Sequence, residues 1–382
     1  MRVGRIVGIA FWLVLTSAAI AQEKTENQAT VSSVVQRSFA AGNVAGFRLL
    51  VTRTESGVSE VVTQALETPG GYGRFETTAE TTTETTGIGS DSVTARREVF
   101  GKNPDGRLKL IERTDADEQK LQDGTSRITQ TTRVPDVNGR LGLTYRRVQE
   151  TKTTAPNVQQ TEIIVSLPGI NAPLREMQRI QQTRRQLDPN LIQTESVNEL
   201  RDANGRWQLT ETRSQELRTL GPGEVVEEET VRRLDGNGQI APSERSVTRR
   251  SAGNGSAQTV TEIYSADILG LTRSARSRLE LNQRVRVTTM TTMGGVTETV
   301  SELEARVPSV TNGPLQVIVR TVETVRQIAP DRWETERRTF RLDGNGRLVQ
   351  TIEQREETQG KAANQALGSV GTRDWAVLSP SF

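Results

Sequence analysis

The sequence predicts an all-β protein, built as one long antiparallel meander of hairpins. Two observations predict this fold class. Turn-like tetrads recur every 33 residues along the chain, and the segments between them carry β-branched residues at alternate positions. A third observation concerns the core: only 33% of residues are hydrophobic, against roughly 45–50% in ordinary globular chains. A thick core is therefore not expected.

The first residues indicate export. Arg2 and Arg5 precede an apolar run over 6–15, and residues 19–21 read Ala-Ile-Ala, the small-x-small form of a signal peptidase site. We interpret residues 1–21 as a cleaved signal peptide, because the run is shorter than the ~18–20 residues that span a bilayer. We expect no transmembrane helix in the mature chain, and a periplasmic or extracellular location, with the outer membrane as the alternative.

The charge of the mature chain excludes one class of partner. The full chain has 49 basic and 47 acidic side chains, and the signal peptide removes two arginines, so 49 − 2 = 47 of each sign remain. Binding to nucleic acid releases counterions through a basic surface. A chain with balanced, interspersed charges gives no basis for such binding, whether to nucleic acid or to anionic lipid.

Residues 22–44 form a short segment before the hairpins. Val31, Val34, Val35 and Phe39 have helical spacing and are followed by Gly42, which predicts a short amphipathic helix over 31–41. Such a helix would cover the first edge of the sheet, where unpaired backbone groups are otherwise exposed.

Residues 45–357 contain the hairpins. Asn138-Gly139-Arg140-Leu141 and Asn204-Gly205-Arg206-Trp207 are two of the tetrads, 66 residues apart. Turns with proline lie about halfway between tetrads, as at Asp188-Pro189-Asn190. The phase slips between residues 240 and 312, so we place an insertion near 266–278.

The segments between turns decide between helix and strand. Residues 315–328 read LQVIVRTVETVRQI, with Leu315, Val317 and Val319 at alternate positions, which is typical of a strand. Residues 174–187 alone have helix-like spacing, but they match 315–328 without a gap. We therefore expect strands throughout.

Turn chemistry predicts the strand lengths. Asn-Gly between strands favours a two-residue type I′ turn, and proline presets the first corner of the other turns. Strands of about 12 residues follow, roughly 16 to 20 in all. A sheet of this width is expected to twist or roll; whether it closes into a barrel stays open.

The sheet is expected to be held together by ladder hydrogen bonds, Thr–Thr pairs and Arg–Glu pairs, and by one weakly apolar concave face. Six residues are assigned to that face: Leu141, Leu143, Trp207, Leu209, Val317 and Val319. Residues 358–382 are Gly-, Ala- and Ser-rich at first, and we interpret them as a flexible C-terminal tail.

The turn sequences resemble those of one known group. Residues 136–141 read Asp-Val-Asn-Gly-Arg-Leu and 343–348 read Asp-Gly-Asn-Gly-Arg-Leu. These phrases are similar to the Asp-x-x-Gly-Arg-Leu core of YD, or Rhs-type, β repeats, which form extended antiparallel sheets in secreted bacterial proteins. The resemblance covers the turns only, lacks the tyrosine of that family, and implies no function.

Missing residue types exclude much chemistry. With no His and no Cys, the chain has no Ser-His-Asp or Cys-His nucleophile pair, no disulfide and no Cys/His zinc site. We expect no cofactor and no enzyme activity.

Two weak metal candidates remain. Oxygen atoms of Asp235, Asn237, Asp343 and Asn345 could face Ca²⁺ in acidic, Gly-rich turns, but neither turn has the further acid of an EF-hand loop, so plain hairpin turns are favoured.

A carboxylate pair for glycoside hydrolysis could come from the run Glu227-Glu228-Glu229. However, 14 aromatic residues (Trp 4, Tyr 3, Phe 7) offer few platforms for sugars, and a run of glutamates is typical of a solvated surface.

The leading hypothesis is a secreted or periplasmic, non-enzymatic repeat protein whose sheet acts as a scaffold or binding surface. Its partner is left open as an envelope or extracellular protein or a glycan. The alternative is an outer-membrane-associated β-barrel, because Ala376, Leu378 and Phe382 are similar to a barrel's last strand, although Pro380 interrupts them. A carbohydrate-active enzyme is the third hypothesis.

Overall fold

A computed structural model describes residues 28–38, 45–69 and 74–359, except 89, 170–171, 236–237, 254, 267–278, 293, 307–313 and 331. The predicted signal peptide, the insertion at 267–278 and most of the predicted tail lie outside the described residues. The described part is all β, as predicted, and forms one antiparallel sheet of 20 strands. Among these residues, no helix is long and apolar enough to cross a bilayer.

The strands follow one another around the sheet in chain order. Their bounds are β1 Gln28–Ser38, β2 Ala45–Ser56, β3 Ser59–Pro69, β4 Phe75–Thr86, β5 Ser92–Lys102, β6 Leu108–Lys120, β7 Ser126–Pro135, β8 Leu141–Ala155, β9 Val158–Gly169, β10 Ala172–Asp188, β11 Leu191–Arg201, β12 Trp207–Gly221, β13 Glu224–Leu234, β14 Ile240–Gly253, β15 Ser256–Ala266, β16 Leu279–Thr291, β17 Thr297–Ala305, β18 Gln316–Ala329, β19 Arg332–Leu342 and β20 Leu348–Gln359.

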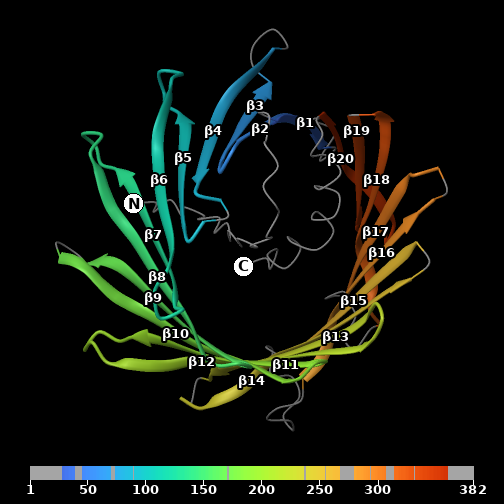
Figure 1. The fold of residues 1–382 in the computed structure, drawn as a ribbon. Coiled ribbons are helices and arrows are strands. Elements are labelled where there is room, and N and C mark those ends of the chain that lie inside the picture. The colour runs from blue at the N-terminus through green and yellow to red at the C-terminus, as the bar shows by residue number, and fades with distance from the viewer. Residues whose placement is uncertain are drawn as a thin grey trace.

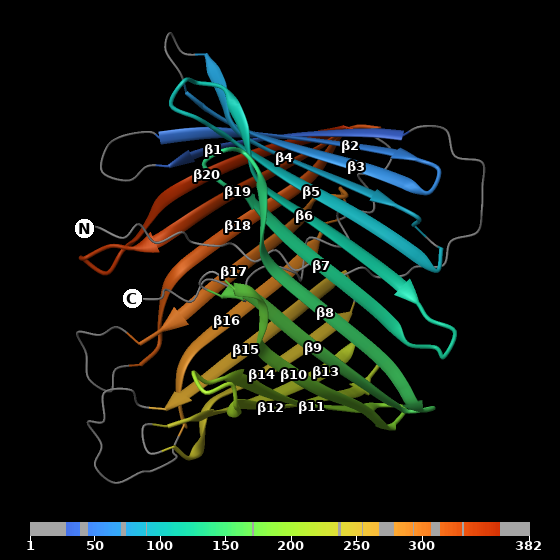
Figure 2. The same ribbon diagram turned by 90° about the vertical axis from the view of Figure 1, so that its left-hand side faces the viewer.

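The sheet closes on itself. β1 pairs antiparallel with β2 on one side and with β20 on the other, with Gln36 opposite Gln354 in the closing ladder. Figure 1 looks along the resulting barrel, and Figure 2 shows its strands inclined to the barrel axis. Tilt and closure go together, because strands can close into a barrel only when they are inclined and staggered. Closure leaves no sheet edge exposed.

The first strand corrects one sequence-based prediction. Residues 31–38 of the expected helix belong to strand β1, and 39–41 lie outside the described residues. Helical spacing of valines is outweighed here by tertiary pairing: β1 is bonded on both sides, and β-branched residues suit a strand. The barrel therefore begins at residue 28 instead of 45 and continues to 359.

The end where odd-numbered strands lead into even-numbered ones is called the Asn-Gly rim. Its turns confirm that Gly139, Gly205 and Gly346 lie at chain reversals. They have a different form from the predicted type I′ turn. The Gly139 N–H donates to the Asp136 carbonyl, 2.9 Å, and the Asp136 N–H to the Arg140 carbonyl, 2.8 Å.

Residues 137 and 138 are thus the central pair, and Gly139 follows with φ 78°, as in a type I turn with a G1 bulge. The side chain of Asp136 determines this type of turn. Asp136 Oδ1 accepts the N–H groups of Asn138, 2.8 Å, and Arg140, 2.9 Å, which a type I′ turn centred on Asn-Gly would not bring together.

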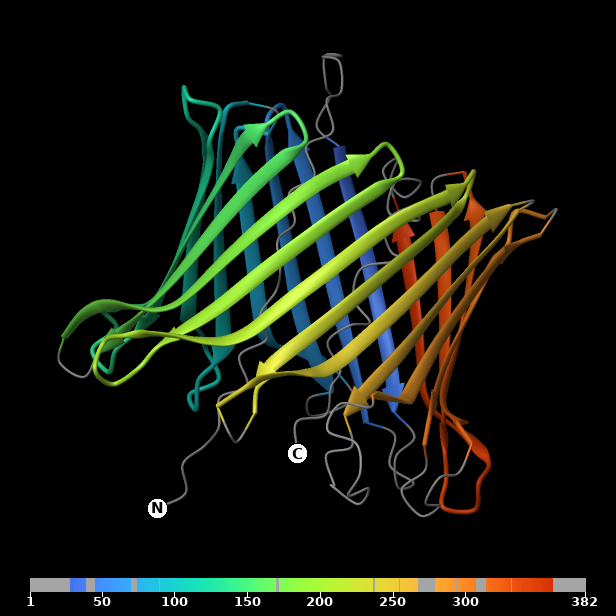
Figure 3. The ribbon, with the colours of Figure 1, turned by 90° about the horizontal axis from the view of Figure 1, so that it is seen from below.

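The opposite end is called the Pro rim, and several of its turns have two residues. Pro156-Asn157, Pro189-Asn190 and Pro222-Gly223 each join a pair of facing strand ends. Neighbouring hairpins are linked there: the Gln186 N–H donates to the Asn157 carbonyl, 2.9 Å, and the Thr219 N–H to the Asn190 carbonyl, 2.8 Å. Figure 3 shows hairpins ending at both rims.

Every even-numbered strand from β4 to β20 contains a β-bulge near the Asn-Gly rim. We call these residues the bulge ring: Thr78, Ile111, Thr144, Met177, Thr210, Ser243, Asn282, Ile318 and Thr351. Five of them are Ser or Thr whose hydroxyl donates to a carbonyl across the ladder, as from Thr210 to Asn198, 3.1 Å. A bulge increases local twist and turns the following side chains to the other face.

Candidate functional site: the two faces and the two rims of the barrel

The ladder register assigns side chains to two faces, because cross-strand partners share a face and alternate residues change face. Seven of the ten buried side chains lie on one face, and Ile163, Thr194 and Thr321 are examples. Curvature crowds side chains on the concave side, so this is the lumen face. The other is the outer face.

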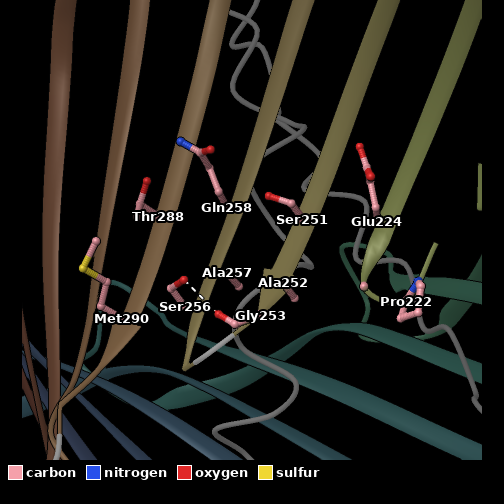
Figure 4. A pocket seen from close by; sticks show the side chains of 11 residues that line it. Pro222, Glu224, Ser251, Ala252, Gly253, Ser256, Ala257, Gln258, Thr288 and Met290 are labelled. Carbon is pink, nitrogen blue, oxygen red and sulfur yellow. Dashed lines mark hydrogen bonds between the residues drawn. The ribbon is translucent and has the colours of Figure 1, made fainter. Parts of the chain in front are cut away.

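A shallow pocket near the Pro rim agrees with this assignment. Glu224, Ser251, Gln258 and Met290 line it, and all four share the outer face by register. Figure 4 shows these side chains with the far wall of the barrel behind them. The pocket has one carboxylate, so it offers neither an acid pair nor a set of metal ligands.

The lumen face carries threonine pairs between neighbouring strands. Thr151 and Thr161 share a hydrogen bond of 3.1 Å, and Thr248 and Thr261 one of 2.9 Å. Each such pair contributes about 0.2–1 kcal/mol. Repetition around the barrel, together with the ladder bonds, stabilises a wall that has almost no enclosed core.

Ion pairs dominate the middle of the outer face. One chain of alternating charges crosses five strands from β14 to β18. Its members, in order of contact, are Arg249, Glu262, Arg284, Glu304, Arg286, Glu302 and Arg320. The shortest contact joins Arg284 and Glu262 at 2.9 Å. The Arg284 guanidinium, opposed by partial burial, holds the pKa of Glu262 below its usual range.

Single carboxylates elsewhere on the outer face bind several arginines. Asp115 contacts Arg96 and Arg113, both at 3.2 Å, and Arg133 at 2.6 Å. Burial works against ionisation of Asp115, but the three guanidinium groups together lower its pKa. The middle of the wall is thus self-neutralised and strongly polar.

The polar outer face bears directly on membrane insertion. A transmembrane barrel needs an outward apolar band about 25 Å tall. Charged side chains also occur on the lumen face, as in the Arg250–Glu227 pair at 2.9 Å. In the described strands, therefore, neither face offers such a band.

The predicted apolar concave face is wrong. Of its six residues, only Val319 lies on the lumen face; Leu141, Leu143, Trp207, Leu209 and Val317 lie on the outer face near the Asn-Gly rim. The bulge ring is the physical reason. Each bulge shifts the alternation by one residue, so the residues between turn and bulge point outward instead of inward.

Trp207 marks this apolar zone. It begins β12, and the guanidinium carbons of Arg179 and Arg201 lie 5.0 Å and 5.7 Å from the centre of its ring. Both distances suit a cation–π contact. Sequence reasoning singled out Trp207 as apolar, but the facing arginines come from β10 and β11 and could not be paired with it from the sequence.

The calcium candidates are turn residues. Asp343 Oδ1 accepts the N–H groups of Asn345, 2.9 Å, and Arg347, 2.8 Å, and Asp235 Oδ1 accepts that of Gln239, 2.8 Å. Asn237 lies outside the described residues. Within the described ranges, no group of three or more His, Cys, Asp or Glu side chains is placed to hold a metal ion.

The glutamate run is split between the faces. Glu227 and Glu229 lie on the lumen face with Arg250 and Arg213, at 2.9 Å and 3.3 Å. Glu228 lies on the outer face, 2.8 Å from Arg245. Each carboxylate is paired with an arginine, so the run forms no pair of acids flanking a substrate bond.

Comparisons with known proteins concern the fold. No family model matches the chain, and no characterised protein matches it in sequence. The siderophore receptor PirA from Pseudomonas aeruginosa is similar in structure, with 8% identity and a TM-score of 0.42 over 89% of this chain and 81% of that chain. OccK3 (OpdO) from P. aeruginosa has 10% identity and a TM-score of 0.41 over 88% and 95%.

The FrpB iron transporter from Neisseria meningitidis is also similar, with 8% identity and a TM-score of 0.42 over 88% of this chain and 81% of that chain. At these scores the likeness is one of wall architecture and assigns neither family nor ligand.

These findings correct the leading functional hypothesis. A secreted or periplasmic scaffold built on a broad sheet is wrong, because the sheet closes on itself. The alternative, an outer-membrane-associated β-barrel, is the hypothesis that the closed sheet favours.

Proposed function

We propose that the chain is an exported, outer-membrane-associated β-barrel and not an enzyme. The observation that carries this proposal is closure: β1 and β20 are bonded along eight register pairs, from Val31 opposite Gln359 to Ser38 opposite Ile352. A closed barrel leaves no free strand edge, so the chain meets its surroundings through the two faces and the two rims of the barrel.

The wall chemistry limits how the barrel meets the membrane. Its ion-paired outer face cannot replace the apolar band of a spanning barrel, so the proposal is association at the membrane surface. The lumen carries threonine, glutamine and charged side chains, such as Thr161, Gln182 and Glu227, which give the barrel a polar interior.

Fractionation of cells that express the full chain tests the proposal. We expect the protein with the outer membrane at moderate salt, released by alkaline carbonate, and migrating faster without boiling than after it, because an intact barrel resists unfolding in detergent. A chain recovered wholly in the soluble periplasmic or culture fraction would contradict the proposal.

A further inference from the structure

Exposed apolar side chains gather at the two rims of the barrel. Among the described residues, each large apolar side chain with high exposure lies near a rim, and thirteen of the nineteen lie at the Asn-Gly rim. We call those thirteen the apolar collar: Leu108, Ile111, Val134, Val137, Leu141, Leu143, Leu167, Met177, Leu200, Leu209, Leu234, Leu348 and Val349. The collar runs from β6 to β13 without skipping a strand and resumes at β20.

The bulge ring aims part of the collar outward. Leu143 and Leu209 each precede a bulge and lie on the outer face, where an unbroken alternation would have placed them in the lumen. Val137, at a turn tip, is 97% exposed. The outward part is about three residues deep, near 10 Å along a strand.

That depth discriminates between two kinds of membrane contact. A spanning barrel needs about 25 Å of apolar surface. An interfacial anchor buries its apolar side chains only about 5–10 Å into the headgroup and acyl boundary. The collar fits the second.

Arginines stand beside the collar. Arg107, Arg140, Arg206 and Arg347 each follow a turn glycine, and within the described part of the chain their side chains have no hydrogen bond and no ion pair. The turn aspartates, in contrast, fold back onto backbone N–H groups. Free guanidinium groups next to apolar side chains suit a surface of lipid phosphates.

The Pro rim has the opposite character on its outer face. There Glu334, 4% exposed, binds Arg326 and Arg355, and Arg127 binds Glu150 at 2.7 Å. Many charges at this rim are paired within the wall, and six of the nineteen exposed large apolar side chains lie there, against thirteen at the Asn-Gly rim. The Asn-Gly rim therefore presents the larger and more continuous exposed apolar surface.

We propose that the apolar collar inserts, rim first, into the surface of an anionic lipid bilayer. This inference rests on the proposed membrane association and assigns it to one end of the barrel. Lipid is favoured over a second copy of the chain, because the outward depth of the collar, about 10 Å, matches the depth to which an interfacial anchor is buried.

Vesicle flotation with the purified mature chain tests the collar. The vesicles contain phosphatidylethanolamine and phosphatidylglycerol, with pure phosphatidylcholine for comparison. Leu141→Glu, Leu209→Glu and Leu348→Glu together should lower partitioning about tenfold or more. Leu187→Glu, Leu220→Glu and Ile328→Glu at the Pro rim, where those side chains are 55%, 59% and 46% exposed, form the matched control and should leave partitioning unchanged.

Quenching of tryptophan fluorescence reports whether the Asn-Gly rim touches lipid. Trp207 lies on the outer face at this rim, and Trp333 lies on the lumen face near the Pro rim and serves as the reference. With brominated lipids in the same vesicles, Trp207 should be quenched in a Trp333→Phe/Trp375→Phe variant, and Trp333 should not be quenched in a Trp207→Phe/Trp375→Phe variant.

The outcomes separate this inference from the proposed function. Three results would overturn insertion of the collar: equal quenching of both tryptophans, an equal loss of partitioning in both triple Leu/Ile→Glu variants, or a collar-dependent dimer in light scattering. Each of them is compatible with fractionation of the protein with the membrane, so the proposed function would still stand. A chain that fractionates as soluble, yet is quenched at Trp207 alone, would overturn the cellular proposal and leave the collar standing.

Discussion

The two rims of the barrel solve the same problem, a chain reversal, with different chemistry. At the Asn-Gly rim, an acid folds back on the backbone, a glycine takes positive φ, and a bulged residue follows that glycine by five positions. At the Pro rim, proline forms two-residue turns and arginines pair with carboxylates. The bulges near the Asn-Gly rim place apolar side chains on the outer face. At the Pro rim the outer face carries charged side chains.

Removing the positive φ at the Asn-Gly rim should have the largest effect on stability. Gly139→Val places a β-branched residue at φ 78°, which should lower the free energy of unfolding by about 2 kcal/mol. Gly142→Val, three residues later in β8 and without positive φ, is the control and should change little. Urea unfolding of both variants checks this; equal destabilisation would contradict the turn assignment.

The turn acids should differ between the rims. Asp202 Oδ1 accepts two backbone N–H groups, from Asn204 at 2.9 Å and Arg206 at 2.8 Å, whereas Asp188 at the Pro rim accepts only that of Asn190, 2.7 Å. Asp202→Ala should lower the free energy of unfolding by about 1.5 kcal/mol, and Asp188→Ala should lower it by about half of that. Thermal unfolding of the two variants compares them, and a larger loss for Asp188→Ala would reverse the comparison.

The charged rim should respond to acid. Burial opposes ionisation of Glu334, but Arg326 and Arg355 hold its pKa below the usual range. A lowered pKa in the folded state means stability that is present at neutral pH and is lost as pH falls below about 4.5 toward the folded value. Glu334→Gln should cost about 1 kcal/mol at pH 7 and nearly nothing at pH 3; a pH-independent loss would exclude this ion pair as the cause.

The smallest expected effect concerns the bulge ring. Thr210→Val removes the hydroxyl bond to the Asn198 carbonyl, 3.1 Å, and should cost about 0.5–1 kcal/mol. Thr212→Val is the control, because Thr212 lies two residues later in β12 and its hydroxyl has no such bond to a carbonyl. Amide hydrogen exchange near the bulge in β11 and β12 should become faster in Thr210→Val only. Unchanged exchange in that variant would show that the bulge does not depend on the hydroxyl bond.

Much of this architecture could be predicted from the sequence, and particular residues show where prediction ends. Gly106, Gly139 and Gly205 are separated by one and two periods of 33 residues, and this spacing predicts the all-β meander and the places of reversal. Closure could not be predicted, because the pairing of Val34 with Glu356 leaves no local pattern. The face on which each side chain near the Asn-Gly rim lies could not be predicted either, since one bulged residue such as Thr144 reverses an alternation that otherwise looks regular.

The candidate site was harder to predict than the fold. Leu141 and Leu209 were recognised as apolar, but assigned to the lumen. A signal for the correction exists in the recurring Ser or Thr at 78, 144, 210, 243 and 351, whose hydroxyls bond across the bulges. Taken alone, those residues look like ordinary strand threonines and serines.

Closure of the barrel is tested most directly by a disulfide between its first and last strands, in a chain that has no cysteine of its own. Gln36→Cys with Gln354→Cys places two thiols at facing register positions of β1 and β20. Mild oxidation should produce an intramolecular disulfide and faster migration in non-reducing gels, whereas Gln36→Cys with Gln193→Cys in β11 should give none. Absence of the β1–β20 disulfide, or cross-linking only between separate chains, would contradict a closed barrel.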